Sequence, residues 1–272
     1  MGSSTSRTAF VETVDHDAGD MDMHEWRSAA SALELLGFRV LRFTSSEITT
    51  LAINVTTPVI GGRRSMRLAL TQIQALQENQ PLPERSDYPV CLVSLLGRTI
   101  TESTLGEALQ ALERGERMFV KPRGASNVKC CTGVVLQGER DAGAEMLVLN
   151  SLPPDTPMWR SQVLEGLVAE FRCYILDGKV EAAVCYKGDE TWSLDMQCVE
   201  AAAATLHASE EGSAAFALDM GVVAVAERDE CNTRTVLVEV NDGFALGLYP
   251  GCPPDLYARM MVARWDEICA RA

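Results

Sequence analysis

The chain has 272 residues, 47% of them hydrophobic, and carries a formal net charge of −14 at pH 7. This length and composition allow a substantial core and more than one lobe. The negative charge argues against a nucleic-acid-binding surface that covers the whole protein. No apolar run approaches the roughly 18–20 residues that span a membrane, and residues 1–6 lack the apolar core of a secretory signal. Gly2 and Ser6 fit a myristoylation pattern, but we expect a leader sequence here.

The first 43 residues are expected to form a strand–helix–strand unit. Residues 8–14 are predicted to form a strand, 26–36 a helix that ends at Gly37, and 38–43 a second strand. This order indicates parallel pairing of the two strands. The acidic, histidine-containing segment 15–25 could bind a metal or an amine, although such loops are more often only solvated.

A proline-rich segment separates this unit from the rest of the chain. Residues 63–77 are predicted to form a helix, entered through the turn at 57–62. Residues 80–89 are the best candidate for a domain boundary. After it we expect a strand at 90–96 and a helix over 103–114, capped by a serine or threonine and stopped by a glycine.

Beyond residue 117 the pattern favours strands. They are predicted at 118–121, 132–137, 145–150, 162–164, 168–176 and 179–187, followed by a hairpin that pairs 221–227 with 234–240. Helices are predicted at 199–218 and 255–271. Because helices and strands are partly segregated, the expected fold class is α+β with a parallel N-terminal part.

The last predicted strand carries polar residues within an apolar run. Glu239 and Asn241 lie two residues apart, so they point to one face, whereas Val238 and Val240 point to the other face, into a core. Two hard oxygen ligands on one face suit Mg²⁺, which shares its remaining ligands with phosphates. The alternative is an edge strand whose polar face contacts only water.

A predicted hairpin also gathers charged side chains. If Asp177-Gly178 is a two-residue turn, Arg172 faces Ala183 and Tyr174 faces Glu181. One face then carries Glu170, Arg172, Tyr174, Ala183, Cys185 and Lys187. Small residues beside the charges favour a ligand cavity, and the alternative is an ion-pair ladder on an exposed sheet. A register slip of one residue would remove the argument.

The four lysines all fall between residues 121 and 187, in a chain whose other 20 basic residues are arginines. A lysine kept among arginines is more often needed for its own chemistry. Lys121, Arg123 and Lys129 surround a loop over 122–133 and could bind a polyphosphate, unless this is only a solvated basic hairpin. The nine cysteines are odd in number and lack CxxC spacing, which favours reduced thiols in a cytoplasmic protein.

Taken in order, these segments resemble motifs of the ATP-grasp superfamily, most closely its small single-domain members. The matching segments are Phe-Val-Lys-Pro-Arg-Gly at 119–124, Gln-Val-Leu at 162–164 before Glu-Phe-Arg-Cys-Tyr-Ile at 170–175, Ala-Leu-Asp-Met-Gly at 217–221, and Leu-Val-Glu-Val-Asn-Asp at 237–242. The resemblance spans about residues 88–250. It implies ATP held between two α+β lobes, 88–165 and 166–272, preceded by a small α/β domain over 1–87.

The resemblance also implies a role for individual residues. The implied nucleotide-binding residues are Arg98, Lys121, Arg123, Lys129, the hinge residues Gln162, Val163 and Leu164, Glu170 and Arg172. Arg172 and Lys187 are the candidate catalytic residues, and Asp219, Glu239 and Asn241 the candidate Mg²⁺ ligands. The first metal carboxylate departs from the family pattern, because strand 221–226 has none, and Asp219 is preferred over Glu227.

Such a site implies an ATP-dependent carboxylate–amine ligase that forms an acyl phosphate from a small-molecule or peptide carboxylate and releases ADP and phosphate. Two alternatives stay open: an ATP-dependent phosphotransferase, and a nucleotide-binding module without catalysis. The expected cofactors are ATP and Mg²⁺, with no nucleic-acid or membrane partner, and a homodimer is left open. The candidate substrate walls are the acidic N-terminal segment, Arg63-Arg64 and the loop 242–251.

Overall fold

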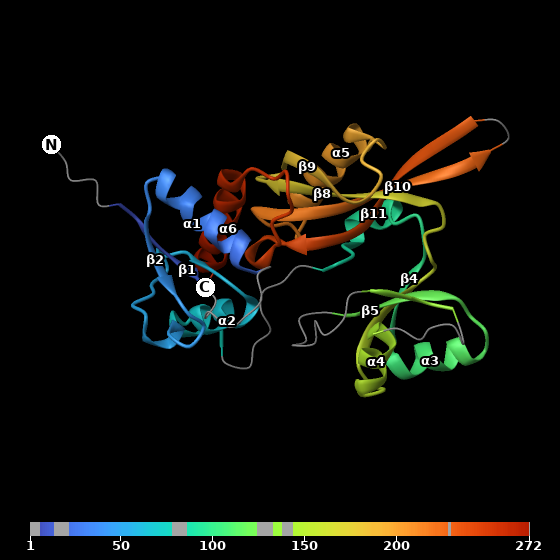
Figure 1. Cartoon of the computed structure of the whole chain (residues 1–272), viewed down its shortest axis with the longest axis horizontal. Coiled ribbons are helices and arrows are strands. Elements are labelled where there is room, and N and C mark those ends of the chain that lie inside the picture. The colour runs from blue at the N-terminus through green and yellow to red at the C-terminus, as the bar shows by residue number, and fades with distance from the viewer. Residues whose placement is uncertain are drawn as a thin grey trace.

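The computed structural model describes residues 6–13, 22–77, 86–123, 133–137, 144–227 and 230–271. Within these ranges the chain forms three sheets, each covered by helices (Figure 1). No helix of the described part is long and apolar enough to cross a membrane. The predicted class, α+β with a parallel N-terminal part, is confirmed.

The first sheet has three short parallel strands, in the order β2 (Arg39–Phe43), β1 (Thr8–Glu12) and β3 (Val59–Ile60). Helix α1 (Asp22–Leu35) connects β1 to β2, and α2 (Arg63–Gln72) follows β3. Gly37 has φ +85°, a conformation that glycine adopts without steric cost, and it ends α1 as predicted.

The last helix of the described chain completes the core of this first unit. Helix α6 (Pro254–Ala270) lies beside α1 (Figure 1). Its Trp265 and Ile268 pack with Phe10 and Phe43 in one buried cluster. The predicted division of the chain at residues 87 and 165 stays a prediction.

The second sheet is antiparallel, in the order β4 (Ile100–Thr104), β7 (Pro157–Ser161), β5 (Met118–Pro122) and β6 (Val134–Leu136). Helices α3 (Leu105–Glu113) and α4 (Ala144–Ser151) accompany it (Figure 1). Thr104 caps α3 in a capping box with Glu107, in agreement with the cap predicted for this helix.

Two predicted strands are helical. Residues 145–150 belong to α4, in which Leu149 is buried, Met146 packs against the same core, and Leu147 is 74% exposed. Residues 90–96 form the 3-10 helix η2 (Val90–Leu95), in which Leu92 is buried and Val93 is exposed. A short apolar run does not distinguish a strand from a partly buried helix, which explains both errors.

The segment 162–164 is not the strand that the sequence predicts, because the strand here is β7, which ends at Ser161. Residues 162–164 have no regular structure and connect β7 to the third sheet. Gln162 still pairs with Thr99, since its backbone N–H donates to the Thr99 carbonyl at 3.3 Å.

The third sheet is also antiparallel, in the order β11 (Glu230–Asp242), β10 (Ala215–Glu227), β8 (Leu167–Leu176) and β9 (Lys179–Gly188). Helix α5 (Met196–His207) covers one face of it. The predicted helix over 199–218 is therefore too long, because residues 215–218 belong to β10. Ala215 and Ala217 are fully buried in the cluster that includes α1 and α6, so these alanines serve close packing.

The register of the β8–β9 hairpin differs from the prediction. Leu176 faces Lys179 as expected, but two irregularities shift the pairing, so that Arg172 faces Val184 and Tyr174 faces Ala182. Glu181 and Tyr186 are the extra residues on β9. The predicted partners Ala183 and Cys185 are therefore wrong. The second shift returns Lys187 to a position opposite Glu170.

Candidate active site

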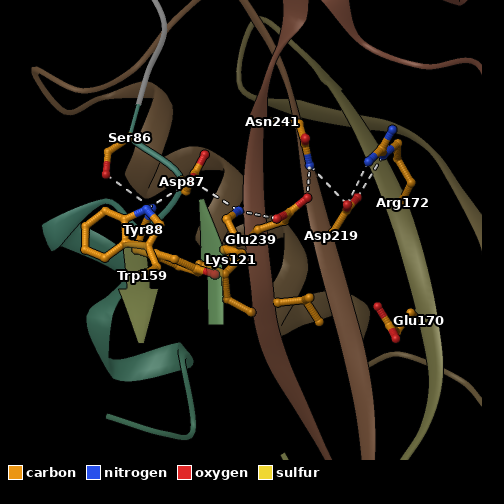
Figure 2. A network of polar contacts seen from close by, with 12 residues as sticks. Ser86, Asp87, Tyr88, Lys121, Trp159, Glu170, Arg172, Asp219, Glu239 and Asn241 are labelled. Carbon is orange, nitrogen blue, oxygen red and sulfur yellow. Dashed lines mark hydrogen bonds and ion pairs between the residues drawn. The ribbon is translucent and has the colours of Figure 1, made fainter. Parts of the chain in front are cut away.

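Strand pairing places the candidate residues in one row across the third sheet. Glu239 on β11 is opposite Asp219 on β10, and Asp219 is opposite Arg172 on β8. One pleat further on, Asn241 is opposite Ala217. Residues opposite one another across neighbouring strands share a face, so the acidic, amide and guanidinium groups meet on one surface of the sheet (Figure 2).

Arg172 and Asp219 form a buried bidentate ion pair. Arg172 Nε donates to Asp219 Oδ1 at 2.8 Å, and Nη2 donates to Oδ2 at 2.7 Å. The two residues are only 7% and 2% exposed. Burial raises the pKa of Asp219, and the hydrogen bonds and charge of Arg172 oppose this rise. Among the contacts of the described residues, Arg172 Nη1 has no hydrogen-bond acceptor, so it remains available to a ligand.

Asn241 bridges the two carboxylates of the row. Its Nδ2 donates to Asp219 Oδ2 at 3.0 Å and to Glu239 Oε1 at 3.1 Å. The pairing of β11 with β10 is irregular just before Glu239, with Val238 as the extra residue. The prediction that Val238 fills the core with Val240 is therefore wrong: Leu237 joins Val240 in the buried cluster and Val238 is only partly buried.

Lys121 reaches the row from the second sheet. Its Nζ donates to Glu239 Oε2 at 2.5 Å and lies 3.1 Å from Asp87 Oδ2 and 5.2 Å from the centre of the Tyr88 ring. Burial by itself would raise the pKa of Glu239, but the charge and hydrogen bond of Lys121 outweigh it and lower that pKa. Burial likewise disfavours the ammonium, yet Glu239, Tyr88 and Asp87 together raise the pKa of Lys121. The pair is therefore ionised at neutral pH.

Sequence reasoning missed three residues of this network. Asp87 Oδ2 accepts from Trp159 Nε1 at 3.1 Å, and the Asp87 carbonyl accepts from the backbone N–H of Val240 at 2.9 Å. The Tyr88 and Trp159 rings meet edge to face at 5.2 Å. Asp87 and Tyr88 follow the proline-rich segment, and no periodic pattern marks them, because their contacts arise where this connection crosses two sheets.

Glu170 and Lys187 lie beside the row rather than within it. Glu170 is buried and accepts from Lys187 Nζ at 2.5 Å and from the Tyr186 hydroxyl at 2.7 Å. The Lys187 side chain is 70% exposed. Glu170 shares the face of Arg172, two residues along β8 (Figure 2), so the predicted face is retained through the shifted register.

Two tyrosines cover Arg172. The Tyr249 ring centre lies 4.5 Å from the Arg172 guanidinium carbon, and the Tyr186 and Tyr249 rings stack at 4.7 Å with an interplanar angle of 5°. Tyr249 belongs to the loop after β11, and this loop is held to β8 because the Tyr174 hydroxyl accepts from the Tyr249 N–H at 2.9 Å. The predicted substrate-wall loop 242–251 thus lies against the site.

The remaining predicted nucleotide residues lie at the edge of this network. Arg98 donates to the carbonyls of Leu237 and Val238, each at 2.9 Å, next to Glu239, and burial lowers the pKa of Arg98. Arg123 pairs with Glu102 and lies 5.2 Å from the ring centre of Trp159. Lys129 lies outside the described residues. Gln162, Val163 and Leu164 form the connection between the second and third sheets.

The donor set fits a hard divalent cation that shares its ligands with a substrate. The described residues contain no cluster of three or more histidine, cysteine, aspartate or glutamate side chains that could hold a metal ion. They offer instead two carboxylates, Asp219 and Glu239, drawn together by the Asn241 amide. Mg²⁺ takes few protein oxygens and completes its shell with water and phosphate oxygens. Asp219, Glu239 and Asn241 would hold it.

Comparison with known families settles the assignment. A family model described as an ATP-grasp domain, the second family of its clade, matches residues 95–260, more than half of the chain. The chain belongs to this ATP-grasp family. A search of curated proteins found no match. The predicted superfamily is thus confirmed, and the second and third sheets, which Lys121 and Glu239 join, both lie within the matched region.

Solved ATP-grasp structures share the fold over nearly the whole chain. D-alanine–D-alanine ligase from Bacillus anthracis, complexed with ATP, is 13% identical, with a TM-score of 0.58 over 98% of this chain and 99% of that one. N5-carboxyaminoimidazole synthetase from Staphylococcus aureus, complexed with ADP, is 10% identical, with a TM-score of 0.53 over 95% and 78%. D-cycloserine synthetase is 13% identical, with a TM-score of 0.51 over 95% and 99%. At these identities the likeness establishes the ATP-grasp fold.

Proposed function

We propose that this ATP-grasp protein is an ATP-dependent carboxylate–amine ligase, which forms an acyl phosphate and releases ADP and phosphate. The observation that carries the proposal is the meeting of Lys121, from one sheet, with the Asp219–Glu239–Asn241 row of the other. A cation and a hard-oxygen donor set face each other there, as the polyphosphate of a magnesium-bound nucleotide requires.

The nucleotide would lie between the second and third sheets. The backbone of residues 162–164 would read adenine, as in the hinge that these residues resemble. Lys121 would contact the phosphates, and Arg172 would donate from Nη1 while Asp219 holds its other nitrogens. Mg²⁺, when bound, supplies positive charge to the β- and γ-phosphates.

The reaction then needs positioning and charge rather than a nucleophilic side chain. A carboxylate oxygen of the substrate attacks the γ-phosphorus, and the bond to the β,γ-bridging oxygen breaks, giving an acyl phosphate and ADP. The amine nitrogen next attacks the acyl carbon, phosphate leaves, and one proton is released as the amide forms. Lys121 and Arg172 stabilise the negative charge on the transferred group throughout. The substrates we expect are a small-molecule or peptide carboxylate and an amine.

Glu239→Ala tests the site directly. We expect it to abolish ADP release and to leave the far-UV circular dichroism unchanged, because Glu239 supplies both the Lys121 contact and a metal-ligand oxygen. Glu116→Gln is the matched control, since Glu116 pairs with Arg114 and Arg160 away from the row. ADP release that is unchanged in Glu239→Ala would contradict the assignment.

The type of reaction is tested by trapping. ADP release is screened across pairs of carboxylates and amines, and hydroxylamine is then added in place of the amine. A hydroxamate indicates an acyl phosphate and supports the ligase. A phosphorylated product that survives hydroxylamine would indicate a phosphotransferase, and tight ATP binding without ADP release would indicate a nucleotide-binding module.

A further inference from the structure

The Lys121 ammonium is shared between two carboxylates that belong to different parts of the site. Its Nζ donates to Glu239 Oε2 at 2.5 Å and lies 3.1 Å from Asp87 Oδ2. Glu239 belongs to the metal row, but Asp87 lies on the opposite side of the ammonium, as Figure 2 shows. One cation therefore occupies an oxygen that the proposed metal ion also needs.

A cation that binds Glu239 must displace this ammonium. Two positive groups at contact distance from one carboxylate repel each other, and their repulsion is large in a partly buried site. The Lys121 side chain is only 14% exposed, so the displaced ammonium also needs a partner within the protein. Asp87 is the described carboxylate that already contacts it.

Asp87 is held in place independently of Glu239. Its Oδ2 accepts from Trp159 Nε1 at 3.1 Å, and its backbone carbonyl accepts from the Val240 N–H at 2.9 Å. The first contact ties Asp87 to β7 of the second sheet and the other ties it to β11 of the third. Asp87 thus keeps its place relative to both sheets when the Lys121–Glu239 contact breaks.

We propose that Lys121 stands in for the metal at Glu239 in the nucleotide-free protein, and that Asp87 is the positioning residue that retains Lys121 when a magnesium-bound nucleotide arrives. This inference rests on the proposed function for the identity of the site. It adds an exchange: the ammonium leaves Glu239, stays on Asp87, and turns its remaining N–H groups to the phosphates.

The stand-in role is tested with Mn²⁺ alone, measured by electron paramagnetic resonance on the nucleotide-free protein. Lys121→Met removes the competing charge, so we expect it to bind Mn²⁺ about tenfold more tightly than the wild type. Lys121→Arg keeps the charge and should bind Mn²⁺ as the wild type does. Adding Glu239→Gln to Lys121→Met should remove the gain. Equal Mn²⁺ affinity of Lys121→Met and the wild type would overturn the stand-in role.

The retention role is tested by calorimetry with magnesium-bound ADP. Asp87→Asn should weaken nucleotide binding about tenfold, the size expected for losing a charged partner, without tightening Mn²⁺ binding. Trp159→Phe, which leaves Asp87 intact but removes its indole donor, should shift affinity in the same direction by less. Glu116→Gln should change nothing. Thermal unfolding of each variant confirms that it is folded, and wild-type affinity in both Asp87→Asn and Trp159→Phe would overturn the proposal.

These measurements separate the two proposals. Both report binding, so they keep their meaning if no pair of substrates releases ADP, a result that would count against the ligase alone. Absence of magnesium-bound ADP binding by the wild type would overturn both proposals together.

Discussion

Arg172 and Asp219 face each other on adjacent strands and are joined by two hydrogen bonds of 2.8 and 2.7 Å between buried groups. This pair fixes the carboxylate that lies beside Glu239, so its geometry sets the geometry of the donor row. Breaking a buried pair from one side costs more than the pair contributes, because a charge is left without its partner.

Arg172→Met should lower the free energy of unfolding by about 3–5 kcal/mol, since Asp219 keeps its charge in a buried position. Arg172→Lys should cost less, because it retains the charge but loses the planar fork. Urea unfolding of both variants checks this order. Combining Arg172→Met with Asp219→Asn should recover part of the loss, and no recovery would argue that the two residues act separately.

Arg264 of α6 should be a second point of high sensitivity. It is 1% exposed and donates to both oxygens of Asp242, at 2.8 and 2.7 Å, and to Glu267 at 2.8 Å. Arg264→Met should destabilise the protein by about 3–5 kcal/mol. The exposed pair of Arg259 and Asp255 on the same helix is the control, and Arg259→Ala should cost less than about 1 kcal/mol by the same unfolding measurement.

Stability should fall in acid partly through Glu239. Its pKa in the folded protein lies below the ordinary value of 4.5, so its contribution is fully present above the unfolded pKa and is lost as pH falls through the folded pKa. The difference in unfolding free energy between wild type and Glu239→Gln should therefore be constant near neutrality and shrink below about pH 4.5. A difference that grew in acid would show that the pKa is raised instead.

Tyr249 should influence turnover through its ring. The ring lies over the Arg172 guanidinium at 4.5 Å and stacks on Tyr186, so it limits the orientations of Arg172. Tyr249→Phe keeps these contacts and should retain most of the ADP release. Tyr249→Ala should lower kcat by about tenfold, the effect of a small misplacement of a positioning group. Equal rates for the two variants would mean that the ring has no part in positioning.

The alternation of β11 is sufficient to predict that Glu239 and Asn241 share a face, because a strand has a period of two whatever it packs against. The position of Asp219 came only from the resemblance to ATP-grasp proteins, and its pairing with Arg172 depends on a long-range strand contact. The hairpin prediction failed at Arg172, because a bulge adds a residue without any signal in the turn. Asp87 could not be predicted, since its three partners come from β5, β7 and β11.

Helix α6 has a consequence for how the protein folds. It brings Trp265 to the core around Phe10 and Phe43, and Arg264 to Asp242 at the end of the metal strand. These contacts join segments from opposite ends of the sequence, and such distant contacts form slowly because the intervening chain must first be closed into a loop. We therefore expect the N-terminal core and the end of β11 to become ordered in the same late step, so that a partly folded chain has no competent site.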